Sequence, residues 1–452
     1  MTWATRFRIR EYLRESLWVV PALGAVIGIL CAAALISIDS HVKVPSDWAY
    51  SPSTASTVLS AIVGAVAALT GFVVTVTVLV AQMASGSFSP RSMRLWYRDP
   101  VLKGALALLI GTLAYSFSLL RRIESTFVPD LGVTLAGLLL IVGLVIFALF
   151  LDRFVHLLRP AAVAALVAKG VRQSLDNDIA GARDLGNVFV GPLEGIAEPA
   201  SLTVRSSRAG AVQAVDLRGI ATWAGRQECL VVLLHSVGEF IESGDVLFEV
   251  YGDPGPADAA ERALRGLVAL GLERTIEQDP AFAIRVMVDV AGKALSPAIN
   301  DPTTAVQVLD YLGDSLRVIG EADRSAPSWH AGAAKRGVVI PVRRWDDFLA
   351  LGMTEIREFG STSIQVLRRM RAVLEKLLQE VRPENRAAVT AELARLDATV
   401  AAGFSGSIDR GWAGIADGQG MGGPERLGRS GQVSVDGEDA TLGRPPVKVV
   451  TD

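Results

Sequence analysis

The hydrophobic residues of this chain are concentrated in four long runs within its first third. A helix needs about 20 apolar residues to cross the hydrocarbon core of a bilayer, and each run is long enough. The runs are Leu17 to Ile38, Val58 to Met83, Val101 to Leu120, and Leu131 to Leu151. Lys103 is their one charged residue, and it lies near an end, from which a lysine reaches the interface. The pattern predicts a four-span transmembrane domain at 17–159 that follows a basic arm at 1–16.

The second run has one face of small and weakly polar residues, which we call the small-residue face. Its members recur at steps of three and four, interrupted only at Val78: Thr57, Ala61, Gly64, Ala68, Gly71, Thr75 and Gln82. Small residues let helices approach closely in lipid, whereas threonine hydroxyls and a glutamine would also contact water or ions in a pore. Gly64, Ala68, Gly71, Thr75 and Gln82 are therefore a candidate pore or helix-packing face, and both interpretations stay open.

The distribution of lysine and arginine predicts the orientation, because cytoplasmic loops carry an excess of these residues. The segments predicted to be cytoplasmic contain Arg6, Arg8, Arg10, Arg14, Arg91, Arg94, Arg98, Arg153, Arg159 and Lys169. The opposite loops contain Lys43, Arg121 and Arg122. We expect a multi-pass membrane protein with both termini in the cytoplasm.

The loop after the second span is basic and aromatic. Arg91, Arg94 and Arg98 share one helical face, and Trp96 adds an aromatic ring. Such a segment suits a helix that lies on an anionic leaflet, although an ordinary loop of the positive-inside type has the same composition. These four residues are a candidate lipid interface.

Beyond a connecting helix and linker at 160–200, short β-branched runs separated by glycines predict a small β domain at 201–252. The runs are Leu202 to Val204, Ala211 to Val215, Cys229 to Leu234, and Val246 to Val250. The turn at Val237 to Leu247 is similar to that of a barrel-sandwich hybrid, so we expect a barrel-like domain. A carrier function is not implied, because 201–252 contains no lysine for a prosthetic group.

A mainly helical domain is expected at 253–402. Asp279-Pro280 and Asp301-Pro302 each place an N-cap residue before a proline at the first helical position. A strand is expected at 338–342, and an amphipathic helical hairpin from Ser361 to Val400. The composition after Gly403, rich in Gly, Asp and Ser, predicts a disordered tail at 403–452. The fold class is thus a four-span helical membrane domain with a cytoplasmic α+β region.

Polar residues gather in one stretch of the helical domain. Its members include Glu277, Asp279, Asp289, Lys293, Ser296, Asn300 and Asp301. Helix caps and a chain break account for Asp279, Ser296, Asn300 and Asp301, and the alternative is a ligand site or a contact with the membrane domain. Asp279, Asp289, Ser296, Asn300 and Asp301 are a candidate functional or structural turn.

Composition and motifs exclude several classes of function. The formal net charge of −3 argues against a general nucleic-acid binder, which needs a concentrated positive field. The GxGxxG match at Gly418 to Gly423 follows no predicted strand, so it does not indicate a phosphate loop. No catalytic, cofactor or metal set is visible among the scattered histidines and the two cysteines. We expect neither a cofactor nor an enzyme.

Two sequence motifs resemble those of a known family. The first runs from Thr70 to Val76 and on to Arg91, and the second comprises Gln278 to Phe282 followed by Ala294 to Ala305. Both are similar to signatures of a bacterial family of predicted membrane proteins, domain of unknown function 2254, over approximately residues 10–400. The resemblance implies a four-span membrane protein with a cytoplasmic domain and no established activity.

Two main hypotheses for the function follow, with the lipid bilayer as the common partner, and an enzyme without a visible catalytic set is the third alternative. The first is a homo-oligomeric channel or transport-type protein in which the second span faces a path and the cytoplasmic region regulates it. The spans hold no acidic relay, which argues against proton-coupled transport. The second is a non-conducting sensor or scaffold that binds lipid or a partner. Any soluble ligand is left unidentified.

Overall fold

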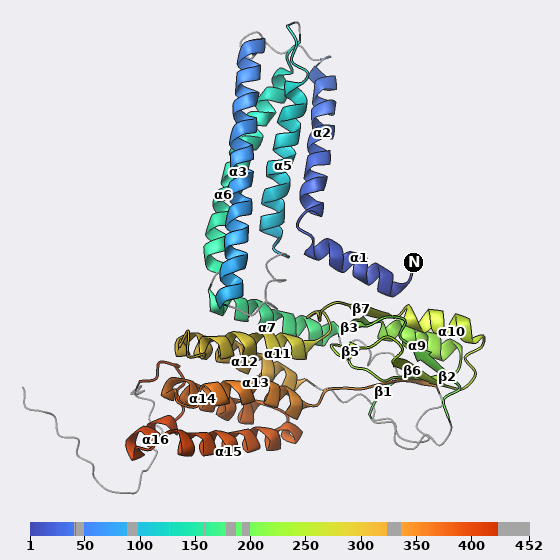
Figure 1. Cartoon of the computed structure of the whole chain (residues 1–452), viewed down its shortest axis with the longest axis vertical. Coiled ribbons are helices and arrows are strands. Elements are labelled where there is room, and N and C mark those ends of the chain that lie inside the picture. Colours follow the sequence, from blue (N-terminus) through green and yellow to red (C-terminus); the bar gives the residue numbers. More distant parts are fainter. Residues whose placement is uncertain are drawn as a thin grey trace, which may run out of the picture.

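The structure is a computed structural model of the 452-residue chain. It describes residues 1–39, 41, 49–87, 98–125, 127–157, 159–177, 187–191, 199–322 and 336–423. A bundle of long helices stands on an extramembrane region of helices and sheets, and a short helix, α1 (Trp3–Glu15), lies between the two parts (Figure 1). The polypeptide therefore crosses from the extramembrane side into the bundle directly after α1.

The described part of the chain contains four helices that are long and apolar enough to cross a membrane. They are α2 (Val19–Asp39), α3 (Pro52–Ser87), α5 (Pro100–Leu120) and α6 (Asp130–Leu157). These helices confirm the four predicted spans. α3 has 36 residues, so at 1.5 Å per residue it is about 54 Å long, whereas the hydrocarbon core is roughly 30 Å thick. Its excess length brings its end to the extramembrane helix α11 (Pro280–Ala294).

The most buried span is α5, and its closest neighbour is α2. Gly24 and Gly28 of α2 lie directly against the backbone of Ala107 and Gly111 of α5. A Cβ added at Gly28 would lie 2.2 Å from the Gly111 carbonyl oxygen, and one at Gly24 would lie 2.3 Å from that of Ala107. In lipid there is no hydrophobic driving force for helix association, so the helices are held by van der Waals contacts, which are most numerous when the backbones are this close. The small-residue contact within the bundle is thus between α2 and α5.

Eight short strands in the described part of the chain form two sheets. The strands are β1 (Val188–Val190), β2 (Leu202–Arg205), β3 (Gly210–Val215), β4 (Leu230–Leu233), β5 (Phe240–Ile241), β6 (Val246–Tyr251), β7 (Val268–Gly271) and β8 (Gly337–Ile340). One sheet has the order β1-β8-β4-β6-β2 and the other β5-β3-β7. The helices α9 (Leu217–Arg226) and α10 (Ala257–Arg265) accompany them, and Ile220, Ile241 and Phe248 are buried in their core.

The predicted strands are present, but the described strands do not form a closed barrel, so the barrel-like expectation is not confirmed. Strand β8 pairs in parallel with both β4 and β1, and it follows the helices α11 and α12 (Pro302–Glu321) in the sequence. Parallel neighbours need a long crossover connection. The pairing is therefore invisible in the local pattern of 201–252.

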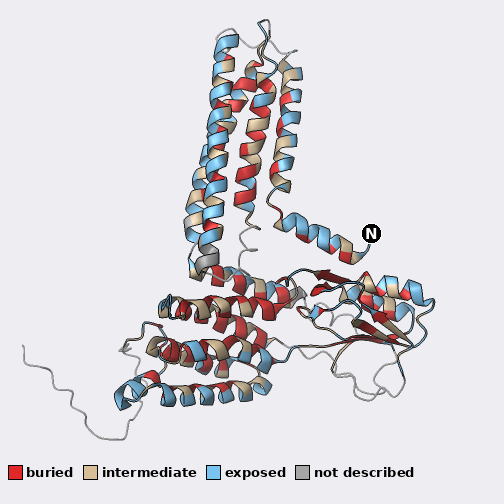
Figure 2. Ribbon diagram, in the orientation of Figure 1, coloured by how far each residue is buried: buried red, intermediate tan, exposed pale blue. Residues whose placement is uncertain are grey.

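Helices below the bundle form the second part of the extramembrane region (Figure 1). In addition to α11 and α12 they are α7 (Pro160–Asn177), α13 (Trp345–Phe359), α14 (Ile364–Glu380), the 3-10 turn η3 (Pro383–Asn385), α15 (Arg386–Gly403) and α16 (Ser407–Ala413). Helix α11 is at their centre and is almost wholly buried, as the red ribbon in Figure 2 shows. Asp279 and Asp301 cap α11 and α12 as predicted, each with a following proline.

The expectation of disorder from residue 403 is wrong for the first part of that segment. After α16, the carboxylate of Asp417 accepts hydrogen bonds from the backbone N–H groups of Gln419, Gly420 and Gly422. The buried Arg368 of α14 donates to the carbonyls of Ile415 and Gly422. Charge-assisted bonds to the backbone hold this glycine-rich loop without the apolar residues that a sequence pattern detects. Residues 424–452 of the expected tail lie outside the described residues.

The contact between α2 and α5 makes a stability prediction. Gly28→Ala should lower the free energy of unfolding by about 1–3 kcal/mol, because the new methyl group overlaps the α5 backbone and the helices must separate. Gly104→Ala is the matched control, since a Cβ there meets no atom within 4 Å. Thermal unfolding of the purified variants in one detergent compares them. Equal melting temperatures for the two variants would contradict the packing.

Candidate functional site

The small-residue face of α3 points away from the bundle. Gly64, Ala68, Gly71, Thr75 and Gln82 are all exposed. The opposite side of the helix is buried against the other spans through Ile62, Val66, Val73 and Val80, among others. A Cβ added at Gly64 or Gly71 would meet nothing within 4 Å. These small residues therefore pack against no other part of the described chain.

The threonines of this face satisfy their donors locally. The Thr75 hydroxyl donates to the Gly71 carbonyl at 2.9 Å, and the Thr57 hydroxyl donates to the Ser53 carbonyl at 2.8 Å. Each hydroxyl oxygen keeps lone pairs that can accept a hydrogen bond or contact a cation. The polar character that the face offers outward is thus that of an acceptor.

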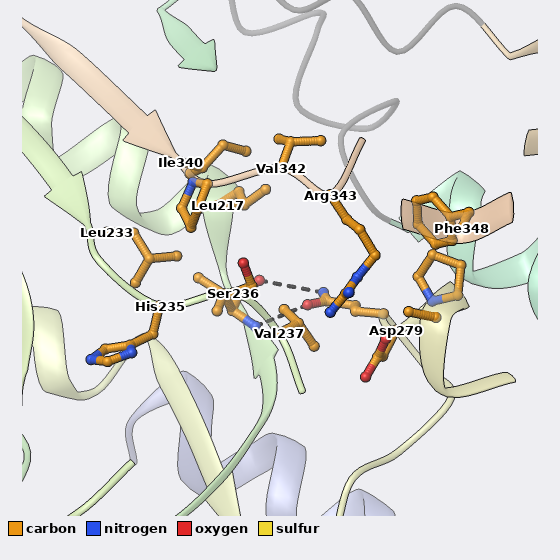
Figure 3. A pocket seen from close by; sticks show the side chains of 15 residues that line it. Leu217, Leu233, His235, Ser236, Val237, Asp279, Ile340, Val342, Arg343 and Phe348 are labelled. Atoms are coloured by element: carbon orange, nitrogen blue, oxygen red, sulfur yellow. Dashed lines mark hydrogen bonds between the residues drawn. The ribbon is translucent and has the colours of Figure 1, made fainter. Parts of the chain in front are cut away.

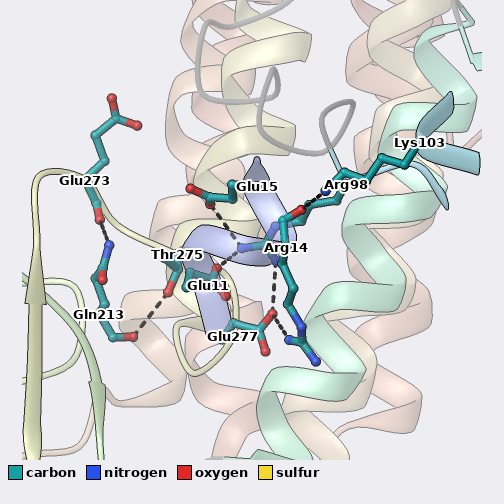
Figure 4. A network of polar contacts seen from close by, with 9 residues as sticks. All are labelled: Glu11, Arg14, Glu15, Arg98, Lys103, Gln213, Glu273, Thr275 and Glu277. Carbon is teal, nitrogen blue, oxygen red and sulfur yellow. Dashed lines mark hydrogen bonds and ion pairs between the residues drawn. The ribbon is translucent and has the colours of Figure 1, made fainter. Parts of the chain in front are cut away.

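A cluster of charged side chains lies where α1, α5 and the segment before α11 meet, and we call it the membrane junction (Figure 4). It comprises Glu11, Arg14, Glu15, Arg98, Lys103 and Glu277. The guanidinium of Arg98 pairs with Glu11, with Glu15 at 3.2 Å and with Glu277 at 3.0 Å. Arg14 also pairs with Glu277, at 3.2 Å, and Lys103 donates to the Arg14 carbonyl. Three segments far apart in the sequence are joined there.

Among the predicted lipid-interface residues, only Arg98 is described. It lies in the membrane junction, with its side chain about three-quarters buried and directed at carboxylates. Arg91, Arg94 and Trp96 lie outside the described residues. The partners of Arg98 in the structure are thus the carboxylates of Glu11, Glu15 and Glu277.

Three consecutive side chains connect the junction to the rest of the extramembrane region. Glu277 pairs with Arg98 in the junction. Gln278 accepts a hydrogen bond from the Val215 N–H at 2.9 Å and donates to the Val215 carbonyl at 3.3 Å, which ties it to strand β3. Asp279 accepts from the Phe282 N–H at 2.9 Å and so starts α11. A displacement of this tripeptide would therefore change its contacts with the membrane junction, with strand β3 and with α11 at the same time.

Asp279 is buried, and its second carboxylate oxygen has no hydrogen-bond partner. Burial raises the pKa of Asp279 above its ordinary value, against the opposing effect of the Phe282 N–H and of Arg274 and Arg343. A Cβ at Gly238, which has a φ of +93°, would lie 2.2 Å from that oxygen. Only glycine accommodates this backbone conformation and this approach together.

A cleft opens beside Asp279, between the sheets and the helices (Figure 3). Its walls include Val215, His235, Gln278, Pro341, Arg343 and Phe348. Arg343 points down into it from the strand-like segment after β8. Within the described part of the chain, the Arg343 guanidinium makes no hydrogen bond or ion pair, and it acts on Asp279 over a longer range. The cleft thus presents a cation that faces apolar side chains and the buried carboxyl group of Asp279.

Comparison with known proteins agrees with this architecture. A family model described as "Predicted membrane protein (DUF2254)" matches residues 14–376. The chain belongs to this family. Uncharacterised proteins of Mycobacterium tuberculosis strains CDC 1551 and H37Rv and of Mycobacterium bovis are each 29% identical over 422 residues, which cover 90% of this chain and 80% of the relative. No solved structure matches it.

The family match locates the features described above. It spans Arg98, Glu277 and Arg343, and so includes the residues that connect α5 to the tripeptide and the arginine of the cleft. It begins at residue 14, near the end of α1. The DUF2254 model therefore covers the bundle and most of the extramembrane region, and most of α1 lies before the first matched residue.

The residues of the predicted turn are divided by α11: Asp279 precedes the helix, Asp289 lies within it, and Ser296, Asn300 and Asp301 lie in the turn that follows it. Asp279 and Asp301 lie at opposite ends of this helix, which at 15 residues is about 22 Å long. Asp289 pairs with Arg285 at 2.6 Å, and the Ser296 hydroxyl donates to the Lys293 carbonyl. Asn300 adopts a left-handed conformation at a φ of +50°. Asp301 accepts from the Thr304 N–H, and no group of three metal-ligating side chains occurs among the described residues.

Asp279 makes a prediction about pH. Because its folded pKa is raised, the folded protein binds this proton more tightly than the unfolded chain does. The free energy of unfolding therefore falls as the pH rises from the ordinary value of 3.8 through the folded pKa. Asp279→Asn keeps the oxygen that caps α11 but cannot ionise, so we expect it to lack this fall and to be more stable than the wild type at neutral pH.

Thermal unfolding in detergent over a pH series measures the difference between the two proteins. Asp279→Ala is the control for the cap, and we expect it to lose about 1 kcal/mol because the Phe282 N–H loses its acceptor. If the melting temperatures of the wild type and Asp279→Asn change with pH in parallel, ionisation of the buried Asp279 carboxyl group does not destabilise the folded protein.

Proposed function

We propose that this protein is a homo-oligomeric, transport-type protein of the bacterial inner membrane in which the small-residue face of α3 lines a path between protomers. The observation that supports this is the exposure of that face on the outside of the bundle, while the apolar side of α3 packs inward. In this proposal both termini and the extramembrane region are cytoplasmic, as the arginine distribution predicts.

The chemistry of α3 favours a channel over a proton-coupled transporter. The helix contains no charged residue, and proton relays inside membranes use ionisable side chains. Thr75 and Gln82 offer oxygen acceptors, and Gly64 and Gly71 leave room beside them. Oxygen ligands can replace part of the hydration shell of a cation. Small cations are thus the solutes that this surface suits best.

The extramembrane region is placed to control such a path. The end of α3 contacts α11, and Glu277, which precedes α11, pairs with Arg98 at the start of α5. A shift of α11 would therefore act on two spans at once. In this proposal the cytoplasmic region acts as the gate, through rigid helices whose contacts differ between two states.

Flux measurements test the proposal. Gly71→Leu fills the face, so we expect it to reduce potassium or sodium flux through purified protein in liposomes by at least about tenfold, a barrier of ~1.4 kcal/mol. Val74→Leu is the control, because Val74 is exposed on a different side of the same helix. Cross-linking of a cysteine at Thr75, in a background without Cys31 and Cys229, reports whether two α3 helices meet. Wild-type liposomes without flux, together with a monomeric protein, would refute the proposal.

A second candidate function is a non-conducting sensor that binds a small anionic molecule in the cleft. The observation in its favour is Arg343, which enters the cleft without a hydrogen bond or ion pair from any described residue. Gln278 and Asp279 line the same cleft, and the residue before them, Glu277, belongs to the membrane junction. A ligand in the cleft would thus change the contacts of the membrane junction.

Ligand-dependent stabilisation tests this second function. Inorganic phosphate and a nucleoside triphosphate are suitable probes, and a bound anion should raise the melting temperature because it binds the folded state alone. Arg343→Gln should abolish the rise. Arg344→Gln is the matched control, since the neighbouring Arg344 is exposed like Arg343 but pairs with Asp346 at 3.0 Å. Equal responses from the two variants would exclude Arg343 as the anion ligand.

A further inference from the structure

Helix α1 has one face that is fully used by protein contacts. Ala4 and Phe7 pack on Ala214 and Ala269 of the three-stranded sheet, and the Ala4 N–H donates to the Gly266 carbonyl at 2.9 Å. One turn further along, Glu11 is buried against Arg98 of the membrane junction. This face fixes how α1 is rotated about its own axis.

The opposite face of α1 is apolar and exposed. Ile9, Tyr12 and Leu13 are 41%, 58% and 45% exposed, although a rotation of 100° per residue places them on one stripe. Trp18, just beyond the helix, is 63% exposed, and its indole N–H donates to the Tyr12 hydroxyl at 3.2 Å. No described part of the chain covers this stripe.

The stripe lies at the level where the chain enters the membrane. α1 ends at Glu15 and the first span, α2, begins at Val19. In Figures 1 and 2, α1 runs sideways from the foot of α2, with the sheet on one side and its exposed face turned toward the space beside the bundle. Because lipid surrounds the spans, that space is the edge of the bilayer, where tryptophan and tyrosine are enriched.

The charges of α1 are sorted between its two faces. The acidic residues Glu11 and Glu15 both pair with Arg98 on the protein side. Arg6, Arg8 and Arg10 are exposed and flank the apolar stripe. The surface that α1 turns to the bilayer is thus cationic around an apolar centre, which is the arrangement of helices that bind anionic lipid surfaces.

We propose that α1 is an interfacial helix that inserts Ile9, Tyr12 and Leu13 into the membrane surface and binds anionic phospholipid headgroups through Arg6, Arg8 and Arg10. The helix is then held between lipid and protein, and it attaches the three-stranded sheet to the membrane surface. This inference goes beyond the proposed transport function, because it holds whether or not the protein conducts ions.

Spin labels on the full-length protein in liposomes test the insertion. In a Cys31→Ala, Cys229→Ala background, one label is placed at Leu13, one at Val26 on the exposed side of α2, and one at Ala398 on the exposed side of α15. We expect the Leu13 label to collide preferentially with oxygen, as the Val26 label does, and the Ala398 label with a water-soluble nickel chelate. A Leu13 label that resembles Ala398 would overturn the proposal.

Lipid composition tests the choice of anionic headgroups. The Leu13 label should be more protected from nickel in phosphatidylcholine vesicles that contain phosphatidylglycerol than in phosphatidylcholine alone. Arg6→Gln/Arg10→Gln should remove this difference. Arg226→Gln/Arg262→Gln, which changes the net charge equally on α9 and α10, should retain it. Loss of the difference in both double variants, or its absence from the parent protein, would overturn the headgroup assignment.

Discussion

The ion pairs of Arg98 hold the extramembrane region in register with the bundle. Taking a charged group out of water costs several kcal/mol of desolvation free energy unless an opposite charge compensates it. Loss of a partner therefore leaves a buried charge that is no longer compensated. Arg98 lies at the foot of α5 and meets Glu11 and Glu15 from α1 and Glu277 from the segment before α11. The three segments are therefore fixed with respect to one another by Arg98, together with the pair of Arg14 with Glu277 and the hydrogen bond from Lys103 to the Arg14 carbonyl.

The consequences of that constraint pass along the chain through consecutive residues. The backbone bends at residues 276–278, so successive side chains there point in different directions. Glu277, Gln278 and Asp279 accordingly reach the junction, strand β3 and the first turn of α11. The cleft with Arg343 lies beside the last two. A ligand in the cleft and a movement of the spans would thus both act on the same few backbone atoms, which is the condition for coupling between two sites.

Features that depend on local sequence were predictable. Four apolar runs gave the spans, β-branched runs gave β2, β3, β4 and β6, and the two Asp-Pro pairs gave the caps of α11 and α12. Features that depend on pairing between distant segments were not. Nothing near Gly337 indicates that β8 enters the sheet beside β4. The contact of Arg98 with Glu277 joins residues 179 positions apart. Arg343 becomes a candidate ligand-binding residue only because the fold places it in the lining of the cleft.

The contrast between two sets of small residues bears on the proposed association of protomers through α3. Gly24 and Gly28 are covered by the α5 backbone, so their lack of side chains is matched by close contact. Gly64 and Gly71 belong to a similar pattern, yet they face outward with nothing beside them. In lipid, helices associate through van der Waals packing, and a groove beside glycines is filled poorly by mobile acyl chains. A second helix, or ordered water between two such faces, would supply the contacts that α3 lacks within one protomer.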